Sequence, residues 1–159
     1  MIDADALNLL AENPHLFAER TSAPCLVTPH MGEMARLTRL SIGEIKANAE
    51  SVARDFANER GVICILKDAH TVVAAPHTDR IYRNDTACSG LATGGSGDVL
   101  AGMLGALCAA GDDPSSAAPL GVYLHSMAGV AASERLSEYA VTARDILDAI
   151  PEAIKHITT

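Results

Sequence analysis

The 159-residue sequence predicts one α/β domain, residues 1–159, folded as a three-layer sandwich with a mostly parallel sheet. Apolar segments typical of strands alternate with segments of helical periodicity, and one short hairpin interrupts the alternation. Hydrophobic residues make up 48% of the chain and charged residues 20%, which suits a globular protein with one buried core. Aromatic residues reach only 3%, so we expect that core to be aliphatic.

The chain opens abruptly for such a fold. Its first two residues resemble the end of a strand, and a helix is expected over 3–11 with no preceding turn. Residues 25–28 then form a short apolar strand. We therefore expect the N-terminal portion of the domain to be missing.

A capping box predicts the next helix. Ser41 and Glu44 have the spacing in which each side chain binds the other residue's backbone N–H. We expect the helix after them to continue to Gly61, with one apolar face made by Ile45, Ala49, Val52, Ala53 and Phe56.

The middle of the chain predicts the remaining strands. Residues 62–66 are a continuous apolar run, as expected for a strand buried on both faces. Residues 71–75 and 80–82 flank a turn at 76–79 and form a plausible hairpin.

Two helices are expected near the C-terminal end. One is a long Ala-rich helix that reaches about Leu136 and is capped by Ser115 or Ser116. The other starts at Thr142 and is bent or interrupted by Pro151.

The charge and the cysteines narrow the class of protein. A formal charge of −8 argues against a broad nucleic-acid or acidic-membrane surface, although backbone amides can still bind a small anion. The four cysteines show no metal-binding spacing, so we expect reduced thiols. The sequence has no signal peptide and no run long enough to span a bilayer, and we expect a cytoplasmic protein.

The strongest chemical signal is the glycine-rich run over 91–102. Gly94, Gly95, Ser96 and Gly97 form a candidate anion hole, because glycines let several N–H groups converge where a helix begins, near Asp98. Phosphate is the natural ligand of such a site, and Asp98 is placed to accept a proton from an attacking hydroxyl. The alternative is a glycine-rich turn in which Asp98 caps its helix.

A second signal lies over 28–33, directly after a strand, where ligands bind in α/β sheets. His30 can donate to phosphate or ribose, and Glu33 can hold a metal or water. The alternative is a turn followed by a helix, in which Glu33 lies in the first turn and only interacts favourably with the helix dipole.

Other polar residues have simpler explanations. Lys67, at the end of the buried strand, is a candidate phosphate or nucleotide contact, or a strand end reaching solvent. Asp3 or Asp5 is expected to cap a helix, and His125 is expected to be a buried histidine with satisfied hydrogen bonds.

Together these segments resemble the ADP- or ATP-dependent NAD(P)H-hydrate dehydratases, a ribokinase-like family of repair lyases. The likeness covers nearly the whole chain, and the sequences over 3–8 and 28–33 distinguish this family from the sugar and vitamin kinases that share only the glycine motif. The matching runs, in order, are 3–8, 28–33, 66–71, 92–102 and 120–129.

The resemblance implies roles for individual residues. Asp98 would be the catalytic base and, with His30, would contact the hydrated NADH or NADPH. The adenine nucleotide, ADP or ATP with Mg²⁺, would be contacted by Gly97 and by Lys67, Asp68, Ala69, His70 and Thr71. Glu33 occupies the place of the superfamily's metal-organising glutamate.

The sequence departs from the family in ways that leave alternatives open. Family members begin well upstream, the usual Thr-Gly-Asn-Pro-Gly is Thr-Ala-Cys-Ser-Gly at 86–90, and Asp68 places a carboxylate near a nucleotide phosphate. The alternatives are a small-alcohol or vitamin-precursor kinase and a non-catalytic nucleotide-binding or assembly module. We also expect a homo-oligomer, because the missing portion should leave a sheet edge and apolar surface exposed.

Overall fold

The computed structural model describes residues 1–158, and the chain divides into two compact units. The first unit runs from Met1 to Arg83, and the second begins at Asn84. Within the described residues, no helix is both long enough and apolar enough to cross a membrane.

The first unit is built on a four-stranded sheet in the order β1-β2-β3-β4. Strand β1 (Leu26–Val27) pairs in parallel with β2 (Ile63–Leu66). The predicted hairpin is confirmed as β3 (Val72–Ala74) and β4 (Ile81–Arg83), which are antiparallel. The sheet is therefore mixed, with its parallel pairing at β1 and β2 and its antiparallel pairings in the hairpin.

The strand-like start of the chain is also present. Ile2 forms an isolated parallel bridge with Val27, so the first residues continue the parallel side of the sheet. All four residues of β2 are buried, as the apolar run at 62–66 predicts.

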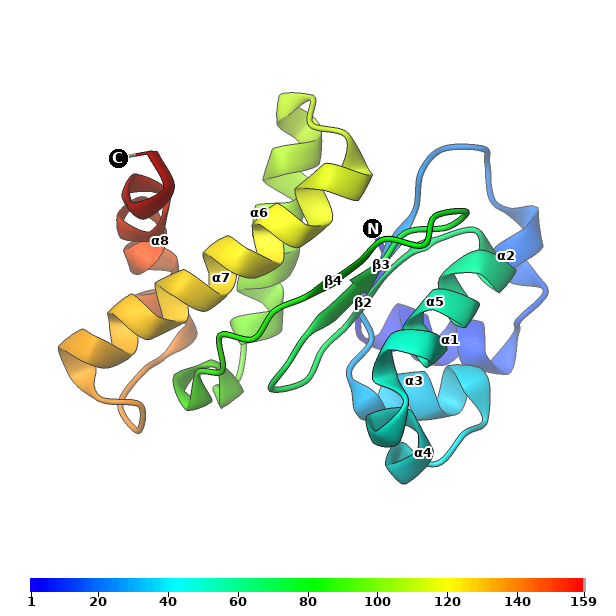
Figure 1. The fold of residues 1–159 in the computed structure, drawn as a ribbon, viewed down its shortest axis with the longest axis horizontal. Coiled ribbons are helices and arrows are strands. Elements are labelled where there is room, and N and C mark those ends of the chain that lie inside the picture. Colours follow the sequence, from blue (N-terminus) through cyan, green and yellow to red (C-terminus); the bar gives the residue numbers. More distant parts are fainter. Residues whose placement is uncertain (159) are drawn as a thin grey trace. The chain divides into compact units, whose positions relative to one another are not determined.

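Five helices accompany this sheet, and Figure 1 shows them gathered on one side of it. Helix α5 packs on β2 and β3, and α1 packs on α3. The core beneath them is aliphatic apart from the edge-to-face pair of Phe17 and Phe56. The helices are α1 (Asp5–Glu12), α2 (Leu16–Glu19), α3 (Met31–Thr38), α4 (Ile42–Ala47) and α5 (Ala49–Arg60).

Two details of the first unit differ from the sequence prediction. The single helix expected from the capping box to Gly61 is two helices, because the backbone of Asn48 leaves helical geometry between α4 and α5. Helix α1 has no side-chain cap: its N-cap is Ala4, with φ 51°, so the capping role expected of Asp3 or Asp5 is wrong.

All regular secondary structure in the described part of the second unit is helical. It contains a short 3₁₀ turn, η1 (Ser89–Ala92), and the helices α6 (Ser96–Ala110), α7 (Pro114–Leu136) and α8 (Ala143–Thr158). Helix α7 packs on both α6 and α8. Close approach of α6 requires a glycine at 121, since a Cβ there would lie 2.7 Å from a methyl carbon of Leu104.

The helix boundaries of this unit correct two expectations. Helix α7 begins with Pro114 after the N-cap Asp113, not at Ser115 or Ser116, because proline suits the first helical turn, where no N–H is needed. Helix α8 continues through Pro151 without interruption.

Candidate active site

The glycine-rich loop of the second unit leads directly into α6. The N-cap of α6 is Gly95, whose φ of 84° lies in the left-handed region that favours glycine. A Cβ at this position would also lie 3.1 Å from the Cβ of Ala143. The left-handed backbone therefore favours glycine at 95, and the short Cβ contact adds to the cost of any other residue.

The first amides of α6 are open. The N–H of Ser96 donates to the carbonyl of Thr93 at 3.3 Å, and no side chain caps the helix. No hydrogen bond within residues 1–158 engages the N–H of Gly97 or Asp98. Unpaired amides at the positive end of a helix dipole are a favourable environment for an anion.

The carboxylate of Asp98 lies in the first turn of α6 and is exposed. It borders a groove of about 680 Å³ in the second unit, which also contains Arg144 and is otherwise largely apolar. The apolar side chains of the groove come mainly from α6 and α8, with Leu124 from α7, and include Val99, Met103, Leu147 and Ile150. Asp98 is thus accessible to a ligand rather than turned into the core.

A buried contact joins the start of α6 to α7. Ser96 and His125 are 5% and 7% exposed, and Nε2 of His125 lies 3.0 Å from the carbonyl oxygen of Ser96. The expectation that His125 is a buried, hydrogen-bonded histidine is confirmed, and its partner is the first residue of α6.

In the first unit, His30 and Glu33 close the N-terminus of α3. Nδ1 of His30 accepts from the N–H of Gly32 at 2.9 Å and of Glu33 at 3.3 Å, while the Glu33 carboxylate accepts from the His30 N–H at 2.8 Å. Because Nδ1 accepts, the proton of a neutral ring is on Nε2, an assignment that follows from the hydrogen bonds.

These two side chains differ greatly in exposure. The His30 side chain is 54% exposed and the Glu33 side chain 6%, and 3.4 Å separates His30 Nε2 from Glu33 Oε1. His30 therefore faces solvent, where it can meet a ligand. No group of three or more His, Cys, Asp or Glu side chains in residues 1–158 is arranged to hold a metal.

Lys67 lies beside this cap, at the end of β2. Its N–H donates to the carbonyl of Pro29 at 2.8 Å, and its ammonium lies 3.0 Å from the carboxylate of Asp3. Burial of Asp3 opposes ionisation, but the nearby Thr28 hydroxyl and the hydrogen bond and positive charge of Lys67 outweigh it and lower the pKa of the carboxyl. Asp3 and Lys67 thus form a charged pair at the strand ends.

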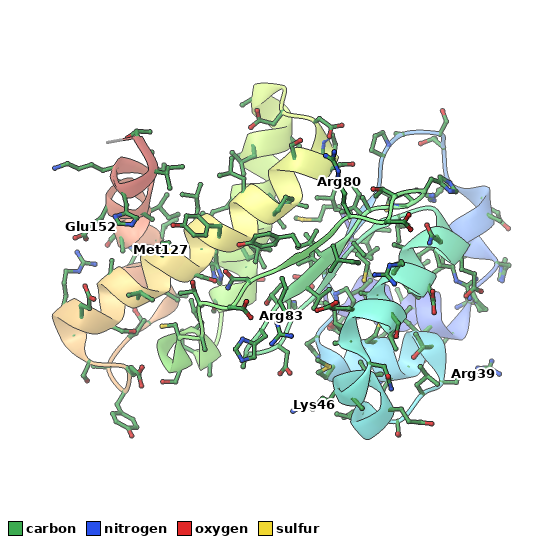
Figure 2. The ribbon with its side chains drawn as sticks, viewed as in Figure 1. Arg39, Lys46, Arg80, Arg83, Met127 and Glu152 are labelled. Carbon is green, nitrogen blue, oxygen red and sulfur yellow. The ribbon has the colours of Figure 1, made fainter. Side chains whose placement is uncertain are left out.

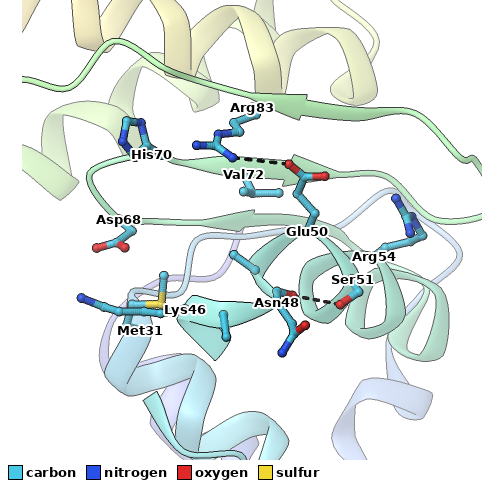
Figure 3. A pocket seen from close by; sticks show the side chains of 12 residues that line it. Met31, Lys46, Asn48, Glu50, Ser51, Arg54, Asp68, His70, Val72 and Arg83 are labelled. Atoms are coloured by element: carbon cyan, nitrogen blue, oxygen red, sulfur yellow. Dashed lines mark hydrogen bonds and ion pairs between the residues drawn. The ribbon is translucent and has the colours of Figure 1, made fainter. Parts of the chain in front are cut away.

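The rest of the predicted nucleotide-binding stretch is more open. Asp68, Ala69 and His70 are exposed, and the Thr71 hydroxyl donates to the Asp68 carbonyl at 3.2 Å. Asp68 and His70 border a pocket of about 430 Å³ (Figure 3). Figure 3 also shows the Arg83 guanidinium pointing to Glu50, 3.8 Å away.

The predicted residues thus fall into two groups. His30, Glu33 and Lys67 lie together in the first unit, and residues 94–98 lie in the second. The sequence interpretation missed Asp3 as the partner of Lys67. Asp3 lies in the run at 3–8 that contributes to the family resemblance, but no local pattern identifies a partner 64 positions away.

Comparison with known proteins supplies a family context. A sequence profile of the NAD(P)H-hydrate dehydratase family matches residues 1–152. The chain is 36% identical to the ADP-dependent (S)-NAD(P)H-hydrate dehydratase of Neisseria meningitidis serogroup B, over 97% of this chain and 55% of that protein. It is 39% identical to the bifunctional NAD(P)H-hydrate repair enzyme of Moorella thermoacetica, over 99% of this chain and 29% of that protein.

Solved structures agree. The ADP/ATP-dependent NAD(P)H-hydrate dehydratase of Bacillus subtilis, co-crystallized with ATP/Mg²⁺, matches with a TM-score of 0.82 and 30% identity, over 97% of this chain and 53% of that one. A ribokinase-like superfamily protein of Enterococcus faecalis matches with a TM-score of 0.78 and 28% identity, over 98% of this chain and 51% of that one. These matches confirm the ribokinase-like fold, and the chain spans about half the length of both structures.

Proposed function

The chain belongs to the NAD(P)H-hydrate dehydratase family, and from this premise we propose that it serves the ADP- or ATP-dependent dehydration of hydrated NADH or NADPH. The observation that carries the proposal is the open N-terminus of α6, with the exposed carboxylate of Asp98 in the same turn. Such a site can hold a phosphoryl group next to a base.

The proposed reaction has two steps. Asp98 accepts the proton of the hydrate's hydroxyl as that oxygen forms a bond to the terminal phosphorus, and the bond from phosphorus to the rest of the nucleotide breaks. The phosphate then leaves with the electrons of its C–O bond, a proton is lost from the neighbouring carbon, and the double bond of the nicotinamide ring is restored. The open amides of Gly97 and Asp98 stabilise the negative charge on the phosphoryl oxygens.

The surroundings of Asp98 support this assignment. The largely apolar groove beside it suits a planar ring. The guanidinium of Arg144, which also borders the groove, lies 3.0 Å from the carboxylate of Asp148 and is held by it. In the first unit, the side chain of His30 is 54% exposed, and its ring is the proposed contact to the hydrate. The stretch from Lys67 to Thr71 is the proposed nucleotide contact, with the ammonium of Lys67 held by Asp3.

Residues 1–158 do not form a protein cage for Mg²⁺. One oxygen of the Glu33 carboxylate accepts from the His30 backbone and the other lies near the His30 ring. When bound, Mg²⁺ would screen the charge of the nucleotide phosphates, which themselves supply most of its ligands. Glu33 stays the predicted protein contact, and no step above depends on it.

Asp98→Asn tests the role of the base. Removing a positioned base should lower turnover by about 10²–10⁴-fold, while the affinity for ADP stays within a few-fold because the backbone amides remain. The measurement is recovery of NADH absorbance from hydrated NADH with ADP or ATP and Mg²⁺, alongside calorimetric titration with ADP.

A matched control changes the same charge elsewhere. Asp112 follows the other end of α6 and is exposed, so Asp112→Asn should leave turnover unchanged. Equal turnover of Asp98→Asn and the native protein would rule out Asp98 as the base. A stable phosphorylated product in place of NADH would favour the kinase alternative.

The assembly state and location remain predictions. We propose a homo-oligomer in the cytoplasm. Light scattering of the purified chain measures its assembly state. Exposed apolar side chains outside the groove, among them Leu9 and Ile42, are consistent with surface that a second copy covers.

A further inference from the structure

A buried histidine on α7 contacts the first residue of α6. Nε2 of His125 lies 3.0 Å from the carbonyl oxygen of Ser96 and 3.2 Å from its hydroxyl. A carbonyl oxygen only accepts, so Nε2 carries a proton and donates to it. Both residues are more than nine-tenths buried.

The loop before α6 has few other means of being held. Gly94 and Gly95 have no side chains, and the helix has no side-chain cap. The N–H of Ser96 makes a long bond of 3.3 Å to Thr93. A glycine-rich loop loses much conformational freedom on ordering, so a fixed contact that orders it has a large effect.

We infer that His125 is a positioning residue for the anion-binding loop: through Ser96 it fixes the first turn of α6, so that the amides of Gly97 and Asp98 point to one phosphoryl group. The inference rests on the proposed function, and it adds a residue that acts without touching the ligand. Loss of this contact leaves the loop free to sample orientations in which the amides diverge, which weakens binding of the anion.

Two substitutions at this position separate positioning from stability. The amide nitrogen of His125→Gln reaches about as far as Nε2, whereas that of His125→Asn reaches only about as far as Nδ1. Both variants keep a polar, smaller side chain at the same buried place. Only the glutamine can restore the bond to Ser96.

A neighbour on the same helix provides the matched control. Ser126 accepts a hydrogen bond of 2.7 Å from Asn84, so Ser126→Ala removes a buried hydrogen bond of α7 that does not involve Ser96. We expect His125→Asn to weaken ADP binding about tenfold, a size set by the loss of one buried hydrogen bond. His125→Gln and Ser126→Ala should stay within about threefold of the native protein, whatever their melting temperatures.

Amide hydrogen exchange in the ligand-free protein provides a second measurement. We expect faster exchange at Gly97 and Asp98 in His125→Asn, but native rates in His125→Gln and Ser126→Ala. If the native protein fails to bind ADP, the proposed function fails, while the exchange rates still decide the role of His125. Unchanged exchange and affinity in His125→Asn, or equal changes in Ser126→Ala, would overturn the inference.

Discussion

Helices α3 and α6 both follow a predicted ligand-binding segment, yet their N-termini are built in opposite ways. The first amides of α3 are occupied by the His30 ring, and Glu33 returns a bond to the His30 backbone. Helix α6 has Gly95 as its N-cap and no side-chain cap, and its amides at Gly97 and Asp98 are open. The first arrangement stabilises the fold locally, whereas the second leaves hydrogen-bonding capacity for a ligand.

Two other helices, α4 and α8, follow the closed pattern. Ser41 and Glu44 cap α4 reciprocally, and Thr142 and Asp145 exchange hydrogen bonds at the start of α8. The C-terminus of α3 is closed as well, by the N–H of Arg39, whose exposed side chain is labelled in Figure 2. Helices α1, α2, α5 and α7 also begin without a side-chain cap. What distinguishes α6 is the left-handed glycine at its N-cap together with the exposed Asp98 in its first turn, and changes at the N-termini of α3 and α6 test the contrast.

The largest effect is expected from Gly95→Ala. A positive φ and a Cβ contact of 3.1 Å with Ala143 both oppose the new side chain, so the free energy of unfolding should fall by about 1–3 kcal/mol. ADP affinity should fall with it, because the loop must move. Urea unfolding and calorimetric titration measure the two effects.

Gly105→Ala is the control for that variant. Gly105 lies inside the same helix, and a Cβ added there would meet nothing within 4 Å, so alanine should raise stability by about 0.5–1 kcal/mol. A stabilising Gly95→Ala would show that the loop tolerates a side chain, contrary to the geometry.

Opening the N-terminus of α3 should have a smaller effect. His30→Ala removes the acceptor for two amides and should cost about 1 kcal/mol of stability, whereas His30→Asn keeps an acceptor and should cost only part of it. Chemical denaturation of both variants measures the difference. Equal losses would mean that the cap contributes little.

The smallest effect concerns the pair of Asp3 and Lys67. Its side chains are 18% and 22% exposed, so Asp3→Asn should cost at most about 1 kcal/mol at neutral pH. Because the folded pKa of Asp3 is lowered, its stabilisation is complete above the unfolded pKa of about 3.9 and disappears as pH falls through the folded value.

The native protein and Asp3→Asn should therefore differ at pH 7 and converge in strongly acidic solution. Urea unfolding at a series of pH values shows this. A difference that persists unchanged to the lowest pH at which both fold would assign the effect to packing instead of charge.

Local patterns in the sequence predicted much of the fold. The capping box at Ser41, the hairpin around 76–79 and the helix after the glycines all depend on residues a few positions apart, and the structure contains each of them. Helix boundaries were less accurate. The break at Asn48 and the start of α7 at Pro114 are hard to predict, because several adjacent residues in each segment suit a helix end about equally well.

Contacts between distant residues were not accessible in this way. The ammonium of Lys67 finds Asp3 only because two strand ends meet, and His125 finds Ser96 only because α7 packs on α6. The cap formed by His30 was not predicted, because histidine is an uncommon N-cap residue and its position after a strand indicated a ligand-binding role instead.

Strand β2 contains a thiol with a practical use. Cys64 is fully buried there, and burial raises its pKa to about 12, whereas the other three cysteines are partly accessible. An alkylating reagent at neutral pH reaches this sulfur only when the strand separates from its neighbours, since the thiolate is the reactive form. The rate at which this sulfur is alkylated in the native chain therefore reports how often the sheet of the first unit opens.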